Sequence, residues 1–412
     1  MSKTRSLLIP QYMLGFNCIG PDCEDSCCIG WRVNIDHITY RKYQRVTDLE
    51  LKEKLNEYMK RNRSNPNEAN YAKVKLNTDR SCPFINEKHL CSIQLKLGEE
   101  YLSDVCTTYP RVANEVNGVL EKSATMSCPQ AARLALLNPE IMAFDETTEP
   151  VTVRNMVNGK IDTHHLSVAN KPQRYFWELR IITIDCLQNR QYGLAERLII
   201  LGMFYQRLQQ LVDDGKLEDI PSLIGTYINR IETGEFKEQL VKIPTQVAIQ
   251  MELLKELTDE RVFKGVNNQR YLDCFAQFLN GIQYTQEATV EEIAARYQAT
   301  EEKYYRPFMT EQEHIIENYM VNYVFKNLFP FSGEKNLFDN YVMLVVHYAL
   351  IKMHLIGMAA FHQGLTIDLV IKLIQSFAKT VEHNNQYFKH IFDLLKQNGY
   401  NTMAYMAILI KN

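Results

Sequence analysis

The sequence predicts a mainly α-helical protein, in which an irregular, metal-pinned, cysteine-rich module precedes an all-helical body. Eight of the ten cysteines lie in the first 128 residues. Beyond about residue 170, apolar residues recur at the three- to four-residue spacing of amphipathic helices. The chain shows neither a G-x-G-x-x-G turn nor regular alternation of strands and helices, so no Rossmann domain is expected. We therefore expect a module at residues 1–135, a linker with a candidate hairpin at 136–170, and a helical body at 171–412.

The composition is that of a globular protein and argues against several functional classes. Of the 412 residues, 46% are apolar and 23% are charged, which is sufficient for sizeable cores. The 46 Lys and Arg residues nearly balance the 49 Asp and Glu residues, so the chain lacks the positive excess of a nucleic-acid binder. No secretory leader and no run of about 18 uncharged apolar residues is visible. We expect a cytoplasmic protein with no nucleic-acid or membrane partner.

Helical periodicity runs through the predicted body. Residues 175–214 place apolar side chains at mostly three- and four-residue intervals, and Gly193 interrupts them. Further helices are expected at residues 221–231, 246–257, 268–282, 290–299, 311–328, 338–362, 365–384 and 386–398. The best strand signal is at residues 150–161, where Val151, Val153 and an Asn158-Gly159 turn indicate a small hairpin.

The cysteine spacing indicates a metal site. A reducing cytosol disfavours structural disulfides, so a dense cysteine group there is more typical of metal binding or catalysis. The first group reads C-x4-C-x3-C-C, and the second reads C-x8-C-x14-C with one more cysteine beyond it. Structural zinc usually takes two closely spaced pairs of ligands, whereas iron–sulfur sites accept a tight group with a distant cysteine. The candidate metal ligands are Cys18, Cys23, Cys27, Cys28, Cys82, Cys91, Cys106 and Cys128, whereas Cys186 and Cys274 are expected in the helical core.

Two features of the first cysteine group have alternative interpretations. The side chains of adjacent Cys27 and Cys28 diverge, so we expect one to bind metal and the other to pack or to hydrogen-bond. Asp22, Glu24 and Asp25 are either additional ligands or acid–base groups, or they form a solvated acidic loop. The solvated loop is the favoured interpretation.

Four segments of the chain are similar to a known family: IPQYMLGFNCIGPDCEDSCCIGW, SCPFINEKHLCSIQLKLGEEYLSDVCTTYPR, SATMSCPQAAR and ENYMVNYVFKNLFPF. They resemble the flagellin lysine-N-methylase family, and the first part also resembles a wider cysteine-cluster class described as zinc- or iron-chelating. The resemblance implies methyl transfer from S-adenosylmethionine (SAM) to surface lysines of flagellin. It also implies an iron–sulfur cluster, of the 4Fe–4S type, bound by some of the eight N-terminal cysteines, with zinc as the alternative metal. No Rossmann-type methyltransferase domain accompanies these features.

Methyl transfer to lysine requires a neutral amine, although the ordinary pKa of lysine is about 10.4. Tyr109 and Arg111 follow Cys106 closely and are candidates to align the amine and to hold the SAM carboxylate with two hydrogen bonds, respectively. The alternative is a tyrosine packed on proline and an arginine in a structural ion pair. Trp31 is a candidate to shield a cluster or to stack on adenine, with core packing as its alternative.

A second candidate patch lies at residues 317–323. Asn318 and Asn322 share one helix face, and Tyr319 and Tyr323 share the next. With Glu317, these side chains are candidates to line a channel for the substrate lysine. A tyrosine stripe at helical spacing is, however, more typical of a core.

Three functions remain open on the sequence alone. The first is a cytosolic flagellin lysine methylase that uses SAM and an iron–sulfur cluster. The second is a non-catalytic metal-binding or redox-sensing protein whose helical body docks a partner. The third is a module held together by structural zinc, with any activity elsewhere. Metal identity separates the third from the others, and SAM binding separates the first from the second.

Overall fold

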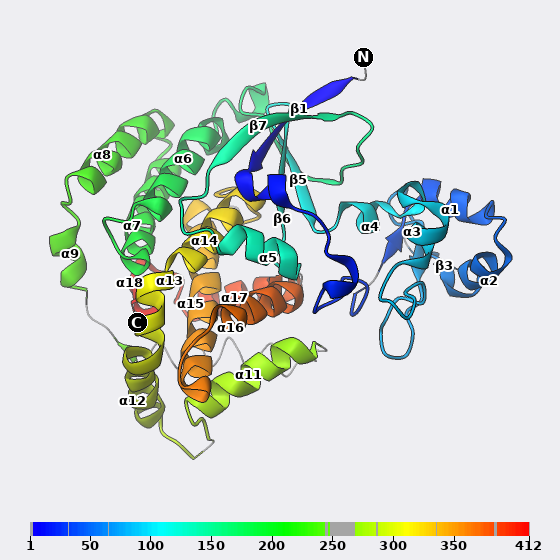
Figure 1. The fold of residues 1–412 in the computed structure, drawn as a ribbon. Coiled ribbons are helices and arrows are strands. Elements are labelled where there is room, and N and C mark those ends of the chain that lie inside the picture. The colour runs from blue at the N-terminus through cyan, green and yellow to red at the C-terminus, as the bar shows by residue number, and fades with distance from the viewer. Residues whose placement is uncertain are drawn as a thin grey trace.

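The computed structural model describes residues 3–31, 33–64, 66–243, 246–247, 268–285, 287–334, 336–382 and 385–411. As predicted, these residues are mainly helical, and no doubly wound parallel sheet occurs among them. Figure 1 shows a small module containing α1–α3 to one side of a large helical body, with α4 and a β-sheet between them.

A five-stranded mixed sheet, which the sequence analysis did not predict, joins the two parts of the chain. Its order is β7 (Phe144–Pro150), β1 (Thr4–Pro10), β6 (Val119–Ala124), β5 (Arg111–Val116) and β8 (Val157–Ile161). β5 and β6 form a hairpin around Asn117 and Gly118, which both have the positive φ that a two-residue type I′ loop requires. β1 pairs with β6 in parallel and with β7 in antiparallel orientation.

The predicted hairpin at residues 150–161 is wrong. β7 and β8 lie at opposite edges of the sheet, and β8 pairs in parallel with β5. Asn158 and Gly159 lie inside β8, where the N–H of Gly159 donates to the side-chain oxygen of Asn114 at 3.1 Å. The domain limits at 1–135, 136–170 and 171–412 stay predictions.

The small module is more regular than predicted. It contains a sheet of order β2 (Asn34–Ile35), β4 (Ala72–Val74) and β3 (Met59–Arg61), with helices α1 (His37–Gln44), α2 (Leu49–Tyr58) and α3 (Ser92–Leu97). α1 and α2 begin at Asp36 and Asp48, whose carboxylates accept hydrogen bonds from the third residue of each helix, at 2.7 and 2.8 Å. Buried residues between 33 and 102 form a separate hydrophobic core. α4 (Asp104–Thr108) then leads back to the sheet.

Most helices of the body follow the predicted ranges, and the predicted break at Gly193 separates α6 from α7; α9 and α18 lie outside those ranges. The helices from residue 129 onward are α5 (Pro129–Leu136), α6 (Phe176–Gln188), α7 (Leu194–Asp213), α8 (Ile220–Glu232), α9 (Lys237–Val241), α11 (Gln269–Gly281), α12 (Val290–Thr300), α13 (Arg306–Gln312), α14 (His314–Lys326), α15 (Leu337–His362), α16 (Ile367–Phe377), α17 (Asn385–Gln397) and α18 (Met403–Ile410). Short 3₁₀ turns are η1 (Gln11–Gly15), η2 (Gly20–Asp22), η3 (Glu99–Tyr101), η4 (Leu166–Val168), η5 (Pro172–Tyr175) and η6 (Leu217–Asp219), and π turns are η7 (Glu301–Tyr305) and η8 (Ala378–Glu382). The helix predicted at 246–257 lies almost entirely outside the described residues.

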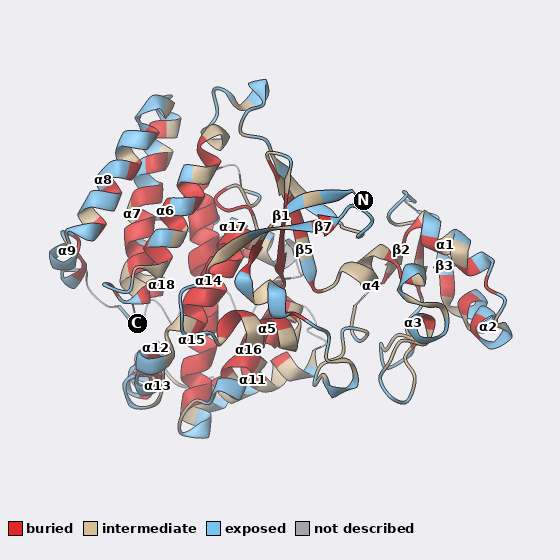
Figure 2. Cartoon of the chain, turned by 45° about the horizontal axis from the view of Figure 1, so that its top comes forward, coloured by how far each residue is buried: buried red, intermediate tan, exposed pale blue. Residues whose placement is uncertain are grey.

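α15 is the central helix of the body. It is long and apolar enough to cross a membrane, but its most apolar 18-residue stretch is wholly buried inside the protein. Helices α7, α11, α14, α16 and α18 contact it, and Figure 2 shows buried residues concentrated along these central helices. Gly281 and Gly357 permit the close crossing of α11 and α15, since a Cβ at Gly281 would lie 1.8 Å from the Gly357 carbonyl oxygen.

The sheet is fixed to the body by buried polar contacts. Arg180 of α6 donates to both carboxylate oxygens of Glu121 in β6, at 2.7 and 2.8 Å. The Tyr12 hydroxyl donates to the Asn322 side chain of α14 at 2.7 Å and accepts the N–H of Ala124 at 2.8 Å. These contacts place the start of the chain against the C-terminal half of the body.

Candidate functional site

The loop at residues 18–28, here called the cysteine loop, contacts both the small module and the body. On the module side, the Cys28 carbonyl accepts the N–H of Cys82 at 2.9 Å. On the body side, the side chains of Glu24 and Asp25 contact helices α5 and α16. In Figure 1 this loop runs between the two parts of the protein.

Six other thiols lie within electrostatic reach of Cys27 in the cysteine loop. All ten cysteines are free thiols. Burial raises the pKa of five of them, and the nearby charge of Cys27 adds to each increase: Cys23, Cys82, Cys91, Cys106 and Cys128. The Cys28 side chain hydrogen-bonds directly to that of Cys27. We call these seven residues the junction thiols. Cys18 is not one of them; its sulfur accepts the N–H of Gly20 within its own loop.

Cys27 and Cys28 have opposite ionisation behaviour. The hydrogen bond from Cys28, opposed by burial and assisted by the Lys379 ammonium, lowers the pKa of Cys27 to about 7. The same hydrogen bond raises the pKa of Cys28. The pair therefore comprises a thiol that ionises readily and one that keeps its proton. The expectation that only one of them binds metal stays a prediction.

Backbone amides at the start of a helix lie near the sulfurs of two other junction thiols, Cys91 and Cys128. Cys91 immediately precedes α3, and the nearby backbone N–H groups of Gln94 and Ile93 oppose the rise in the pKa of its thiol, although its side chain does not cap the helix. Cys128 immediately precedes α5, and the backbone N–H groups of Ala131 and Gln130 likewise oppose the rise in the pKa of its thiol without a capping hydrogen bond. Hydrogen bonds to sulfur favour the thiolate and help to set the properties of thiolate-bound clusters. These environments suit sulfur ligation.

The thiols are gathered without forming a ready-made metal site. Within the described residues, no three His, Cys, Asp or Glu side chains are arranged to hold a metal ion. The metal-pinned module is therefore not confirmed. The donor chemistry still fits an iron–sulfur cluster better than a hard cation, because the groups around Cys27 are free thiols from four separate segments of the chain.

Trp31 and Tyr109 cover the cysteine loop. Their rings pack edge to face with centroids 4.7 Å apart, and the indole N–H of Trp31 donates to the Cys27 carbonyl. The Tyr109 hydroxyl lies 3.2 Å from the Ser127 hydroxyl. Burial holds the pKa of Tyr109 well above its ordinary value, so the phenol keeps its proton at neutral pH. Both residues lie beside the junction thiols, as the sequence analysis expected; their roles stay predictions.

Arg111 lies at a pocket of about 500 Å³, here called the first pocket. Thr107 and Thr108, which directly follow Cys106, also line it. The Arg111 guanidinium stands 5.0 Å from the centre of the Phe16 ring. No carboxylate of the described residues forms an ion pair with Arg111, so the structural ion pair considered from the sequence is not seen. Its charge is available to an anionic group in the pocket.

Glu317, Asn318 and Asn322 of α14 do not line a common channel. The Glu317 carboxylate is buried and accepts hydrogen bonds from Arg190 at 2.8 Å and Arg197 at 2.6 Å. The Asn318 amide donates to the carbonyls of residues 136 and 138, and that of Asn322 donates to the carbonyl of residue 124 at 3.1 Å. Their side chains therefore point to three different neighbours. This corrects the predicted grouping: these polar residues anchor α14 to the surrounding elements.

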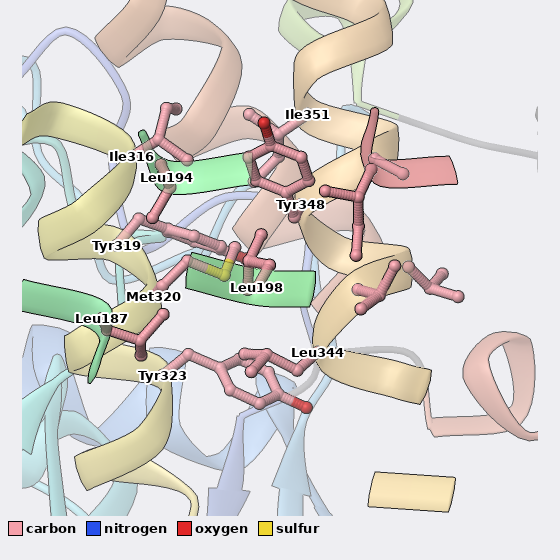
Figure 3. Close-up of a cluster of buried hydrophobic side chains, with 14 of the residues drawn as sticks. Leu187, Leu194, Leu198, Ile316, Tyr319, Met320, Tyr323, Leu344, Tyr348 and Ile351 are labelled. Atoms are coloured by element: carbon pink, nitrogen blue, oxygen red, sulfur yellow. The ribbon is translucent and has the colours of Figure 1, made fainter. Parts of the chain in front are cut away.

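Tyr319 and Tyr323 lie in the apolar core between α7, α14 and α15, as Figure 3 shows. The Tyr319 hydroxyl donates to Glu382 at 2.5 Å. Tyr323 also lines a second pocket of about 790 Å³, where its ring lies 4.7 Å from that of His347. The core interpretation of the tyrosine stripe is thus the one that the packing favours, although Tyr323 reaches a cavity.

The sequence analysis named Glu24 and Asp25 but missed their partners on the body. Glu24 accepts both terminal nitrogens of Arg133, at 2.5 and 3.2 Å, and Asp25 accepts from Gln375 and Lys379, both at 2.7 Å. The solvated-loop interpretation therefore holds only in part: Asp22 and Glu24 are exposed, but Glu24 and Asp25 also dock the loop on the body. No local pattern signals a partner some 350 residues away in the chain.

Comparison with known proteins identifies the family of the chain. Residues 180–409 match the family model described as the FliB lysine N-methylase C-terminal domain. The chain belongs to the FliB lysine N-methylase family. The Lysine-N-methylases of Salmonella choleraesuis and Salmonella typhimurium are each 23% identical to it, over 92% of this chain and 93% of their own length. The Flagellar biosynthetic protein FliU of Salmonella muenchen is 29% identical over 33% of this chain and 80% of its own. No solved structure matches the chain.

Proposed function

We propose that this member of the FliB family transfers methyl groups from SAM to lysine side chains of flagellin, and that the junction thiols hold an iron–sulfur cluster. The family and the Lysine-N-methylase relatives support lysine methylation. The flagellar relative FliU supports a flagellar substrate. The observation that carries the proposal is the gathering of thiols around Cys27 beside a pocket lined by Arg111, which forms no ion pair with the described part of the chain.

Four junction thiols are the proposed cluster ligands: Cys27, Cys82, Cys91 and Cys106. The pKa of Cys106 is raised by burial and then by the charges of Cys91, Cys82 and Cys27, so these four sulfurs lie within mutual electrostatic reach. Cys28 is the alternative to Cys27. A cluster held by three of these thiols would supply an open, Lewis-acidic iron position for the methionine part of SAM.

The first pocket is the proposed SAM site. Its volume of about 500 Å³ is within the range of ordinary small-molecule sites. Arg111 would hold the SAM carboxylate through two charge-assisted hydrogen bonds. The other cations of the lining are already engaged, since Lys122 pairs with Glu149 and Arg154 donates to the carbonyl of Leu102 at 2.7 Å. Arg111 is therefore the residue of this lining best suited to a new anion.

The proposed reaction needs little proton chemistry from the protein. The lone pair of the lysine nitrogen attacks the methyl carbon, the carbon–sulfur bond breaks, and S-adenosylhomocysteine leaves with that electron pair. The amine must be neutral when it reacts, and its proton passes to water. Tyr109, which stays protonated, would orient the amine by hydrogen bonding rather than act as a base. Trp31 would exclude water from the thiols.

Metal analysis tests the cluster. Protein purified without oxygen is expected to absorb near 400 nm and to contain roughly four irons and four sulfides per chain, as a 4Fe–4S cluster requires. Cys106→Ser should lose both the colour and the methylation of flagellin, whereas Cys186→Ser, in the buried core, should keep the iron. A colourless protein with stoichiometric zinc would favour the structural-zinc alternative. Methylation retained by a colourless Cys106→Ser variant would exclude a catalytic cluster.

SAM binding tests the pocket. Arg111→Met should weaken SAM binding by about ten- to a hundredfold, the worth of a lost charge-assisted hydrogen bond. Lys160→Met, which removes an exposed cation from the same sheet, is the matched control. Calorimetric titration with SAM measures both variants. Unchanged affinity in Arg111→Met would place SAM elsewhere.

The choice of protein substrate is tested separately. Methylation of unrelated lysine-rich proteins at the rate of flagellin would contradict the proposed substrate.

A further inference from the structure

The C-terminal part of the body binds the cysteine loop through hydrogen bonds to Asp25. Gln375 of α16 is completely buried, and its amide nitrogen donates to Asp25 at 2.7 Å and to the Ser127 carbonyl at 2.8 Å. Lys379, one turn later in η8, donates to the other Asp25 oxygen at 2.7 Å and to the Ser26 carbonyl at 3.1 Å. Both oxygens of one carboxylate are thus held by successive turns of the body.

The orientation of the Gln375 amide follows from its neighbours. Both groups near its nitrogen are acceptors, so a rotated amide would face two oxygens with its own oxygen. The Gln375 oxygen has no partner among the described residues, although it is buried. A buried acceptor without a partner has a cost in stability that an ordinary core position avoids. Glutamine here is therefore better explained by its contact with Asp25 than by the packing of α16.

The π turn η8, which carries Lys379, is itself fixed to the body through Glu382. At the other end of η8, Glu382 accepts hydrogen bonds from Tyr319 at 2.5 Å and Lys326 at 2.7 Å. Although burial opposes ionisation, Lys326 and His347, with these hydrogen bonds, hold the pKa of Glu382 at about 2. η8 is therefore anchored to α14 at one end and to the cysteine loop at the other. A π turn of this kind often occurs at functional sites.

We propose that Gln375 and Lys379 are positioning residues that fix the Asp25–Ser26 turn, and thereby place Cys27 opposite the thiols of the small module. Cys27 directly follows Asp25 and Ser26, the two residues that Gln375 and Lys379 hold, so fixing this turn also fixes the position of Cys27. The cysteine spacing alone supplies no such restraint. The C-terminal domain of the family would thus take part in building the N-terminal thiol site. The consequence for a cluster rests on the proposed function, whereas the consequence for the loop itself does not.

Hydrogen–deuterium exchange of the full-length protein, as purified, tests the restraint. Lys379→Met keeps the apolar stem but removes the charge, and Gln375→Leu keeps the approximate volume but removes both donors. In each variant, the amides of residues 22–31 should exchange about ten- to a hundredfold faster, since charge-assisted hydrogen bonds are lost. Lys379→Arg should restore much of the protection. Lys372→Met, on α16 but near Cys274, is the matched control and should exchange like the parent protein.

A second readout concerns metal retention. If a cluster is present, iron loss to a chelator should be faster in Lys379→Met and Gln375→Leu than in Lys372→Met. Unchanged exchange at residues 22–31 in both variants would overturn the proposal, and so would faster exchange spread over the whole of α16, which signals general unfolding. A protein without iron or methylation would contradict the proposed function while leaving the exchange test intact. Faster exchange with unchanged iron retention would confine the restraint to the loop and overturn its role in placing Cys27.

Discussion

Glu317→Gln decides whether the Glu317 carboxylate is structural or catalytic. The carboxylate is 1% exposed and pairs with Arg190 and with Arg197, which is itself 2% exposed. Removing one partner of a buried pair typically costs about 3–5 kcal/mol. Because Glu313 still pairs with Arg197 at 2.7 Å, we expect the lower end of that range, about 3 kcal/mol. With an unfolding entropy of about 2.1 cal/mol/K per residue, the Tm of the 412-residue chain should fall by about 3–4 °C.

A thermal scan by circular dichroism, run beside a methylation assay well below the transition, measures this prediction. The control is Glu311→Gln, which changes an exposed glutamate three residues before the start of α14. This variant should leave the Tm unchanged. The double variant Arg197→Met with Glu317→Leu should recover part of the loss, because neither charge is then buried alone. An unchanged Tm together with a more than tenfold loss of methylation would refute the structural assignment and restore the catalytic one.

Three further outcomes follow from the packing and from the buried histidines. Gly281→Ala should lower the free energy of unfolding by about 1–3 kcal/mol, because its Cβ would overlap the facing helix, whereas Gly225→Ala, with open space around it, should not; urea titration compares them. Gly118→Ala should cost about 1 kcal/mol by the same assay, since its φ of 79° disfavours a side chain; no loss would contradict the hairpin loop. Burial lowers the pKa of His347 and His354 to about 4, so the unfolded chain binds more protons between pH 6.5 and 4. Stability should be complete above about pH 6.5 and fall towards pH 4 by about 1.2 kcal/mol per pH unit for each histidine; His354→Gln should remove one share of that slope.

Most helices of the body were predictable because apolar residues recur along them at three- to four-residue spacing, and because Gly193 marks the break between α6 and α7. The strands were not, for a physical reason that β6 shows. Glu121 and Lys122 are buried in it, because Arg180 and Glu149 neutralise them from distant parts of the chain. Buried charges hide the alternation by which a strand is recognised. The Asn117-Gly118 turn signal was nevertheless present between β5 and β6, and indicated the true hairpin.

The candidate site was predictable in its chemistry but not in its geometry. Cysteine density drew attention to the first 128 residues, where a metal site stays a prediction, and Cys186 and Cys274 are buried in the body as expected. The spacing did not reveal which thiols lie within reach of Cys27, or that Asp25, two residues before it, is held by contacts from α16 and η8. Polar residues of α14, such as Glu317, resemble a site in sequence because a buried structural network uses the same residue types as an active site.

The chain path explains why thiols so far apart in sequence meet. The chain leaves the five-stranded sheet after β1 and returns to it at β5, so residues 11–110 form an excursion from that sheet. The sheet holds both ends of the excursion close together, with Cys18–Cys28 on the outgoing segment and Cys106 on the returning one. Cys82 and Cys91 pack against the separate core of the small module. Since that module has its own core and its own capped helices, we expect metal binding to lock its orientation against the body rather than to fold it. Metal removal should then leave the far-ultraviolet circular dichroism nearly unchanged while increasing the proteolysis of the segments that join the module to the sheet.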